Sequence, residues 1–301
     1  MSADMPAIWT VIVNWKCAEE TAACLASLAR CADPTPVIVV DNGSADGSVE
    51  VIRSRFPDVV LLAMPSNLGF ARAANIGIAR ALERGADAVL LLNNDTIVAP
   101  DAPRRLAEAL ASSERIGVIS PKIFLFDQPG RLWSVGGVYR DHNAIDLGTG
   151  ELDYGQYDAA ALDFVYGCAM LLRASMLRAI GGFDERFFMY YEDVDLCLRA
   201  RAAGYEVKLA PAAHVLHHGS RSTLRRPDAK LFYEARSRMQ FFAKHLTASQ
   251  KPRFYAGESR YLVALTLRRL LAGDARGARA YVRGWLSGLL APGDRRPAGI
   301  V

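Results

Sequence analysis

The sequence predicts an α/β protein with a mostly parallel sheet flanked by helices and a helical extension at the C-terminus. Three observations support this fold class. Short apolar runs rich in β-branched residues alternate with helix-length segments over residues 1–120, turn residues separate them, and residues 227–290 have helical patterning. Repeated strand–helix–strand units place the strands in parallel, because the crossover helices cover the faces of the sheet.

The elements of the first 120 residues follow one another with clear boundaries. Strands are expected at 9–15, 34–40, 59–64 and 88–92, and helices at 19–30, 48–55, 69–84 and 102–112. Pro57 stops the second helix, and Gly85 follows the third helix where a C-cap glycine is preferred. The chain can therefore build a four-strand parallel core before residue 120.

The regular alternation ends after residue 120. Residues 127–160 are rich in Gly, Asp and Tyr and predict loops or short antiparallel strands. Beyond them we expect a strand at 164–173, a helix at 175–180, a tight turn at 181–183, a strand at 206–210, helices over 227–290 with a break around 273–277, and a disordered tail at 292–301. The length of 301 residues suffices for one large core or two modest ones.

The bulk composition excludes several classes of protein. A net charge of +4 does not require a nucleic-acid partner, although arginine dominates after residue 221. Five cysteines without a Cys-x-x-Cys pair indicate a reducing compartment and no structural disulfides, with Cys24 and Cys31 buried on one side of a helix. No secretory signal and no apolar run of about 18 residues is present, so we expect a cytoplasmic protein without a spanning helix.

Three carboxylates lie close together at the start of a predicted helix. They are Glu192, Asp193 and Asp195. A helix N-terminus favours negative charge, so an acidic helix cap is one interpretation. General acid–base chemistry is the other.

A second polar cluster, Asn93-Asn94-Asp95, directly follows the apolar run 88–92. Open α/β sheets bind ligands at the carboxyl ends of their strands. Asp95 supplies a carboxylate for a divalent cation, whereas Asn93 offers only a neutral oxygen or a hydrogen bond. The alternative is a simple turn before Pro100.

Polar residues also end the first two strands. Asn14 ends the first, and Asp41 ends the second. A carboxylate at such an edge can accept hydrogen bonds from a ribose or from the N–H of a base. Alternatively, Asp41 caps the turn made by Asn42 and Gly43. The Gly-x-Gly-x-x-Gly dinucleotide fingerprint is absent after the first strand.

The third helix opens with Asn67, Gly69, Arg72 and Asn75 in a short span. Arg72 and Asn75 are three residues apart and share a helix face. A cation and an amide near a helix N-terminus suit a phosphate or a nucleobase. The alternative is an exposed Arg beside an Asn that packs.

Three histidines lie close together near the end of the last predicted strand before residue 227. His217 follows a strand-like run, and His214 and His218 lie beside it. An imidazole with carboxylate and diphosphate oxygens would make a plausible Mn²⁺ site. The residues alone do not choose among the three.

Taken in order, these segments resemble inverting nucleotide-sugar glycosyltransferases of family 2, which have the Rossmann-like GT-A fold. The resemblance covers residues 8 to about 245. The segments that carry it are Thr10-Val-Ile-Val-Asn-Trp, Val40-Asp-Asn-Gly-Ser, Asn67-Leu-Gly-Phe-Ala-Arg, Leu92-Asn-Asn-Asp, Gly181-Gly-Phe-Asp-Glu, Tyr191-Glu-Asp-Val-Asp-Leu and His217-His-Gly. The stretches Trp133…Gly136-Gly137 and Gly181 to Met189 are similar to those of bacterial rhamnosyltransferases.

The resemblance implies a role for each matching residue. Asp193 matches the catalytic base, Asp95 the metal-binding Asp of Asp-x-Asp, and His217 the His that completes the metal site in some relatives. Asn93 departs from the pattern, because the first Asp of Asp-x-Asp is expected there. The residues expected to bind the nucleotide sugar are Asn14, Asp41, Asn67, Arg72, Asn75, Asn93 and Asn94, and those expected to position the acceptor are Glu192, Asp195 and Gly182.

The implied domains are a catalytic domain at 1–245, with a nucleotide-binding half at 1–120 and an acceptor half at 121–245, and a helical extension at 246–291. The implied activity is one-step inverting transfer of a sugar, with rhamnose as one option, from a dTDP- or UDP-linked donor with Mg²⁺ or Mn²⁺. The acceptor would be a saccharide or a polyprenyl-diphosphate-linked saccharide in cell-envelope polysaccharide synthesis. Three alternatives are left open: an inactive nucleotide-sugar-binding module, a sugar-phosphate nucleotidyltransferase and a scaffold protein.

The C-terminal extension combines Leu, Trp and Tyr with Arg in the segments 261–271 and 281–290. Such helices can lie in a membrane interface, with arginines meeting anionic headgroups at the inner face of the cell membrane. Packing on the catalytic domain or in a homodimer is an equal alternative.

Overall fold

The computed structural model describes residues 5–140, 143–219 and 227–290, and it divides the chain into two compact units. The first unit contains residues 1–183 and 193–220, and the second contains residues 184–192 and 221–301. The sequence-predicted tail at 292–301 lies outside the described residues. The two units are described separately below.

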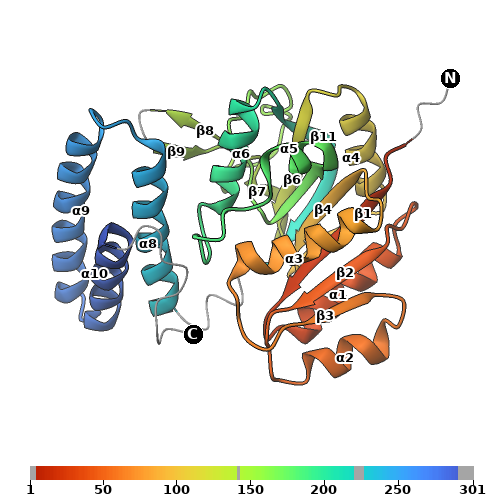
Figure 1. Ribbon diagram of the computed structural model, residues 1–301, viewed down its shortest axis with the longest axis horizontal. Helices are drawn as coiled ribbons and strands as arrows, with labels where there is room; N and C mark the ends of the chain where they lie inside the picture. The colour runs from red at the N-terminus through yellow and green to blue at the C-terminus, as the bar shows by residue number, and fades with distance from the viewer. Residues whose placement is uncertain (1–4, 141–142, 220–226, 291–301) are drawn as a thin grey trace. The chain divides into compact units, whose positions relative to one another are not determined.

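The first unit is built on a nine-stranded sheet (Figure 1). Its strands, in spatial order, are β3 (Val60–Ala63), β2 (Val37–Asp41), β1 (Ile8–Asn14), β4 (Ala88–Asn93), β10 (Ala169–Arg173), β6 (Ile116–Leu125), β11 (Glu206–His217) and β5 (Thr96–Val98), with β7 (Gln128–Ser134) beside β6. A separate hairpin consists of β8 (Gly137–Arg140) and β9 (Asn143–Asp146). The first four strands are parallel, and β10 is antiparallel to both β4 and β6.

The helices of this unit cover both faces of the sheet, which confirms the predicted α/β class. They are α1 (Ala18–Ala29), α2 (Ser48–Arg55), α3 (Phe70–Glu83), α4 (Ala102–Ala111), α5 (Ala174–Ile180) and α6 (Glu192–Ala202). Adjacent residues of β1 point to opposite faces of the sheet. Val11 lies against α3, where a Cβ on Gly77 would be 2.4 Å from its side chain, and Ile12 packs on the other face in the core that contains Leu25 of α1. Burial on both faces explains why the parallel strands are continuous apolar runs.

Most predicted elements agree with the structure to within a few residues, and helix 48–55 has the predicted bounds. Gly85 adopts a φ of 82° after α3, as a C-cap glycine should. Two strand predictions were wrong in extent. β10 begins only at Ala169, because residues 165–166 are irregular and residues 167–168 form a turn. β11 continues through Pro211 to His217, because a register shift between Ala210 and His214 accommodates the proline.

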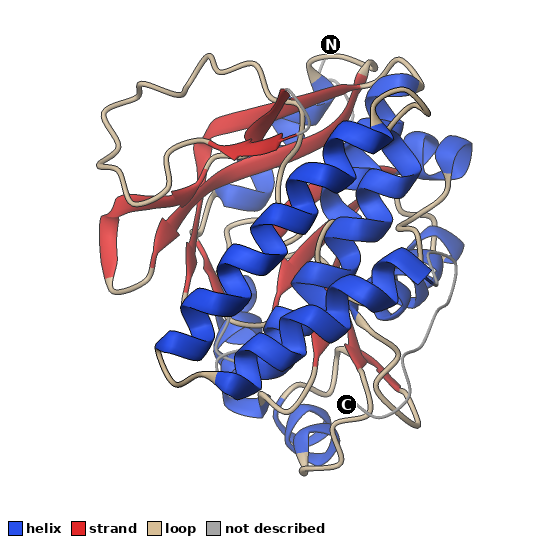
Figure 2. Cartoon of the chain, turned by 90° about the vertical axis from the view of Figure 1, so that its left-hand side faces the viewer, coloured by secondary structure: helices blue, strands red, loops and turns tan. Residues whose placement is uncertain are grey.

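The second unit is dominated by three long helices, α8 (Pro227–His245), α9 (Lys251–Leu271) and α10 (Ala275–Leu290). Figures 1 and 2 show them side by side. The predicted break near residue 273 is present, and a further break at residues 246–250 was not predicted. Cβ atoms on Gly284 and Gly288 would lie 2.1 and 2.4 Å from backbone oxygens of α8, so these glycines allow α10 to pack closely on α8.

Candidate functional site

The turn between β4 and β5 places Asp95 beside His217. Antiparallel pairing sets Thr96 of β5 opposite His217 at the end of β11, and the backbone N–H of His218 donates to the carbonyl of Asp95 (3.0 Å). Nε2 of His217 lies 3.2 Å from Oδ1 of Asp95, and both side chains are buried. His214 is exposed and contacts Pro211, and the His218 ring stacks on Phe126, whereas the buried His217 ring faces the Asp95 carboxylate.

The surroundings of His217 strongly favour its charged form. Burial opposes protonation, but Cys168 and Asp95 outweigh it and raise the pKa of His217 to about 10. Burial also raises the pKa of the Cys168 thiol, so near neutral pH Asp95 supplies the negative charge. The Trp133 ring meets the imidazole edge-on, with centroids 4.6 Å apart. Cys168 and Trp133 were not assigned to the site from sequence, although Trp133 lies in a segment that carried the resemblance.

Asp193 is the second residue of α6 and is buried. Its Oδ2 accepts a hydrogen bond from the backbone N–H of Gly167 (2.9 Å), and its Oδ1 accepts one from Val194 (2.8 Å). Burial raises the pKa of Asp193 despite these bonds, and the charge of Asp146 acts in the same direction. A carboxylate with a raised pKa is a better proton acceptor than an ordinary one, as a general base requires.

The backbone before α6 is in a rarely populated conformation. Tyr190 and Tyr191 have φ values of 69° and 67°, in the left-handed region that is costly for residues with a Cβ. Strained residues of this kind cluster at functional sites. Glu192, which follows them and begins α6, is buried.

The segment 166–168 links the two acidic clusters. The Gly167 N–H binds Asp193, and the next carbonyl, that of Cys168, accepts a hydrogen bond from the N–H of Asn93 (2.8 Å). The Cys168 thiol is close enough to His217, Asp95 and Asp193 for all three to change its pKa. Side chains almost a hundred residues apart in the sequence therefore converge at the carboxyl edge of the sheet.

A continuous polar network joins the ends of β1, β2 and β4. The Asn14 amide donates to Oδ2 of Asp41 (2.7 Å), and its Oδ1 accepts from Thr21 (2.8 Å) and from the Asn94 amide (3.3 Å). Ser44 completes the network, because its hydroxyl and N–H donate to the two oxygens of Asp41 (2.6 and 3.0 Å). Asp41 thus caps its own turn, as one interpretation expected, and it also anchors the network.

Hydrogen bonds hold the loop before α3 at the same edge of the sheet. The Asn42 amide donates to Oδ1 of Asn67 (3.0 Å), and Oδ1 of Asn42 accepts from the N–H of Leu68 (2.8 Å). The Asn67 side chain also accepts from the N–H of Gly69 (2.9 Å), and Arg72 is exposed one turn later. Asn42 was considered only as a turn residue from sequence, and the structure makes it the link between β2 and this loop.

Two predicted site residues, Asn75 and Gly182, lie together at the turn that leads to Phe183. The Asn75 side chain accepts from the N–H of Phe183 (2.8 Å) and donates to its carbonyl (2.9 Å). A Cβ on Gly182 would lie 2.3 Å from Oδ1 of Asn75, so this pair of hydrogen bonds requires glycine at position 182. Arg199 holds the same turn by donating to the carbonyls of Ile180 and Gly182, and it pairs with the fully buried Asp195 (2.8 Å).

Asp95 and His217 fit a divalent cation in part. A carboxylate oxygen and an imidazole nitrogen both suit Mn²⁺. Among the described residues, no group of three or more His, Cys, Asp or Glu side chains is arranged to hold an ion. The protein therefore offers two ligands, and oxygens of a bound substrate would have to supply the others. Because a metal needs the neutral imidazole, binding must also displace the proton that His217 carries.

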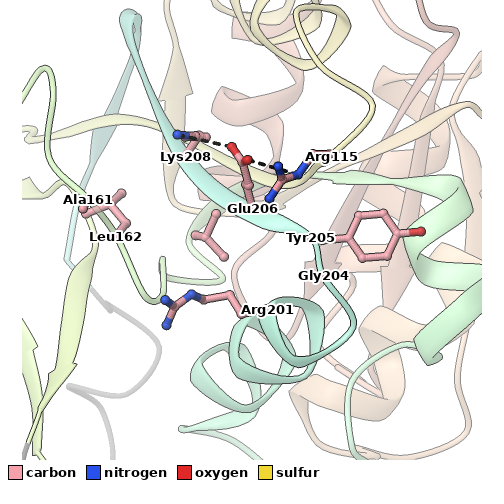
Figure 3. Close-up of a pocket in the computed structure, with 9 residues that line it drawn as sticks. Arg115, Ala161, Leu162, Arg201, Gly204, Tyr205, Glu206 and Lys208 are labelled. Atoms are coloured by element: carbon pink, nitrogen blue, oxygen red, sulfur yellow. Dashed lines mark ion pairs between the residues drawn. The ribbon is translucent and has the colours of Figure 1, made fainter.

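A pocket of about 340 Å³ lies at the opposite edge of the sheet, where β6 and β11 begin (Figure 3). Glu206 forms ion pairs there with Arg115 (3.4 Å) and Lys208 (3.3 Å), and Arg201 on the pocket wall pairs with Asp163. β11 runs from Glu206 to His217, so its 12 residues separate this pocket from the Asp95–His217 pair by roughly 35 Å. None of the site residues predicted from sequence lines it.

Comparison with known proteins gives consistent results. An N-acetylglucosaminyl-diphospho-decaprenol L-rhamnosyltransferase of Mycobacterium tuberculosis is 32% identical over 241 residues, which cover 73% of this chain and 78% of the relative. The mannosyltransferase PcManGT of Pyrobaculum calidifontis, solved with GDP-Man and Mn²⁺, has a TM-score of 0.57 at 17% identity, covering 94% of this chain and 87% of its own. S. aureus TarS in complex with UDP has a TM-score of 0.53 at 14% identity, covering 93% and 90%.

These two solved structures confirm the predicted GT-A architecture, and at such low identity they bear on the fold alone. The model of the glycosyltransferase like family 2 matches residues 6–251, which is most of the chain and includes every predicted site residue. The chain therefore belongs to glycosyltransferase family 2 and is a glycosyltransferase.

Proposed function

We propose that this enzyme transfers a sugar, with inversion, from a nucleotide-diphosphate donor to a hydroxyl of a lipid-linked saccharide. The observation that carries the proposal is that one short segment holds both groups: the Gly167 N–H binds Asp193, and the neighbouring Cys168 carbonyl accepts from Asn93, two residues before the Asp95 that pairs with His217. A buried base serves proton removal, and a separate buried pair of a carboxylate and an imidazole serves diphosphate binding. Sharing one edge of the sheet lets both groups act on one substrate pair.

The Asp193 carboxylate accepts the proton of the acceptor hydroxyl as the oxygen attacks the anomeric carbon. The bond to the departing diphosphate breaks in the same step, so the configuration at that carbon inverts and no covalent enzyme intermediate forms, as in inverting glycosidases. Gly167 and Val194 hold Asp193 through backbone hydrogen bonds, which fix the carboxylate without neutralising it. Burial of Asp193 removes competing water from the base.

Asp95 and His217 would hold Mg²⁺ or Mn²⁺. When bound, such an ion supplies positive charge next to the departing diphosphate. Asp41 and Asn14 form a rigid hydrogen-bonded edge beside Asn94, where the nucleoside would bind. In this assignment, Asn75 and Gly182 act indirectly, because the oxygen and the nitrogen of the Asn75 amide are both hydrogen-bonded to the backbone of Phe183.

The names of related proteins guide the choice of donor and acceptor. The Mycobacterium tuberculosis relative is named as an L-rhamnosyltransferase acting on N-acetylglucosaminyl-diphospho-decaprenol. We therefore propose a rhamnose donor linked to dTDP or UDP and a polyprenyl-diphosphate-linked acceptor. An acceptor of this kind resides in a membrane, so the reaction would take place at a membrane surface.

The test is a transfer assay with the purified chain, Mn²⁺, a panel of nucleotide sugars and a short-chain polyprenyl-diphosphate saccharide. We expect one donor to raise the melting temperature, because a ligand that binds only the folded state stabilises it. The same donor should yield a nucleoside diphosphate and a product of inverted anomeric configuration, read by NMR. Release of a nucleoside monophosphate would instead indicate a nucleotidyltransferase, and retained configuration would exclude the one-step mechanism.

A further inference from the structure

One face of α9 is apolar yet exposed. Val263, Leu267, Leu270 and Leu271 are all exposed, and Leu271 is 90% exposed. Their spacing of three, four and seven residues places them on a single side of the helix, with Arg260 one turn before them. The opposite side of α9 packs inward through Phe254, Leu262 and Leu265. We call residues Arg260, Val263, Leu267, Leu270 and Leu271 the α9 face.

The neighbouring helix treats its large side chains differently. Tyr281 and Trp285 of α10 are buried against Met239 of α8. α10 packs its aromatic residues inside its own unit and exposes Leu286, Leu289 and Leu290 at its C-terminal end, whereas the exposed leucines of α9 share one face with Val263. A row of exposed large apolar side chains is uncommon on a soluble surface and marks a binding site.

The two helices α9 and α10 carry an excess of positive charge. Between residues 251 and 290 the sequence has eight Lys and Arg residues and two acidic residues, Glu258 and Asp274. Both acids are already paired, Glu258 with Arg238 (2.8 Å) and Asp274 with Arg269 (2.6 Å). Six arginines of α9 and α10 are exposed: Arg253, Arg260, Arg268, Arg276, Arg279 and Arg283.

We propose that the α9 face and its surrounding arginines dock on an anionic lipid surface. Leucines of an interfacial helix can enter the boundary between headgroups and acyl chains, while arginines at the same level pair with lipid phosphates. A second copy of this chain suits the face less well, because a two-fold contact would bring the same arginine-rich surfaces together. No helix in the described ranges has both the length and the apolar character to cross a bilayer, so the contact is peripheral.

The first experiment is flotation of the full chain with vesicles that contain neither acceptor nor nucleotide sugar. One set is pure phosphatidylcholine, and the other contains 30 mol% phosphatidylglycerol. We expect binding only to the anionic set, and its loss as salt screens the arginines. Since the assay involves no transfer, its failure would contradict the docking surface and leave the proposed reaction standing.

Two double variants separate the apolar contribution from the charge. Leu267→Gln with Leu271→Gln, and Arg260→Gln with Arg268→Gln, should each lower the partition coefficient on anionic vesicles by tenfold or more, as an order of magnitude. The matched controls are Leu152→Gln and Arg53→Gln, exposed residues of the first unit, which should bind like the parent. Circular dichroism and transfer to a water-soluble acceptor should be unchanged in all four.

Two results would overturn the proposal. One is equal binding of the parent and both double variants to anionic vesicles. The other is an absence of vesicle binding together with a dimer in sedimentation velocity that Leu267→Gln with Leu271→Gln converts to monomer, which would assign the α9 face to self-association.

Discussion

At the carboxyl edge of the sheet, where β1, β2, β4 and β11 end, the charged side chains are buried. Asp41, Asp95, Asp193 and His217 each have less than a tenth of their surface exposed. At the other edge, Glu206 pairs with Arg115, whose side chain is 75% exposed, beside a pocket of about 340 Å³. Burying charge is costly, so a fold retains it where the charge has a task, whereas exposed ion pairs cost and contribute little.

The two edges therefore differ in how deeply they bury charge, and the pocket lies at the edge where the charge is exposed. Burial raises the pKa of Asp193, which suits a general base, and Cys168 and Asp95 raise the pKa of His217 against the effect of burial. Around the pocket, ion pairs link Arg115, Lys208 and Glu206 near the surface. We expect the two edges to differ in function as they differ in burial.

The largest expected effect is on Asp193. Asp193→Asn removes the proton acceptor and should lower turnover by about a thousandfold, within the range measured for general bases. The thermal shift given by the donor should persist, because the base contacts the acceptor hydroxyl. Steady-state kinetics and donor titration measure the two quantities on one preparation. Turnover within tenfold of the parent would remove Asp193 from the mechanism.

Asp95 ranks second. Asp95→Asn weakens one of the two side-chain ligands and should lower turnover by about a hundredfold, as is common for changes at a metal site. The distinguishing measurement is the Mn²⁺ concentration that gives half-maximal activity, which should rise. Asp153→Asn is a matched control, because that carboxylate pairs with the buried Lys122 in the same unit. An unchanged metal requirement in Asp95→Asn would place the ion elsewhere.

The pH dependence of stability provides a third test. Burial raises the pKa of Asp193 in the folded state, so ionising this group costs the fold stability as pH rises through that pKa. The side chain at position 193 cannot ionise in Asp193→Asn. The melting temperature of the variant minus that of the parent should therefore increase from pH 4 to pH 8. A constant difference would mean that the folded protein does not disfavour the ionised carboxylate.

The smallest effect is expected at the opposite edge. Arg115→Ala breaks an exposed ion pair with Glu206 and should change the free energy of unfolding by less than about 1 kcal/mol. Turnover should stay within about twofold of the parent. A large loss of activity with normal stability would show that the pocket takes part in the reaction and would break the proposed contrast between the edges.

Local sequence pattern was sufficient for the elements that carry the parallel half of the sheet. Strand and helix periodicity placed β1, β2, β4 and α2, and the polar residues that follow the strands marked Asn14, Asp41 and Asp95. These predictions succeed because each depends on residues within one turn or one strand. The bulge after Ala210 and the turn at residues 167–168 were missed, because pairing with β6 and the hydrogen bond from Asn93 to Cys168 decide them.

The sequence by itself determined the α/β class, the polar strand ends and the acidic start of α6, and resemblance selected Asp193 and Asp95. Tertiary structure alone set the His217 ring against Asp95, brought Cys168 and Trp133 to it, and bonded Asn75 to Phe183. It also decided that Tyr281 and Trp285 of α10 are buried while Leu267 and Leu271 of α9 are exposed. The reason is that periodicity is fixed by neighbouring residues, whereas burial and partners depend on contacts between segments far apart in the chain.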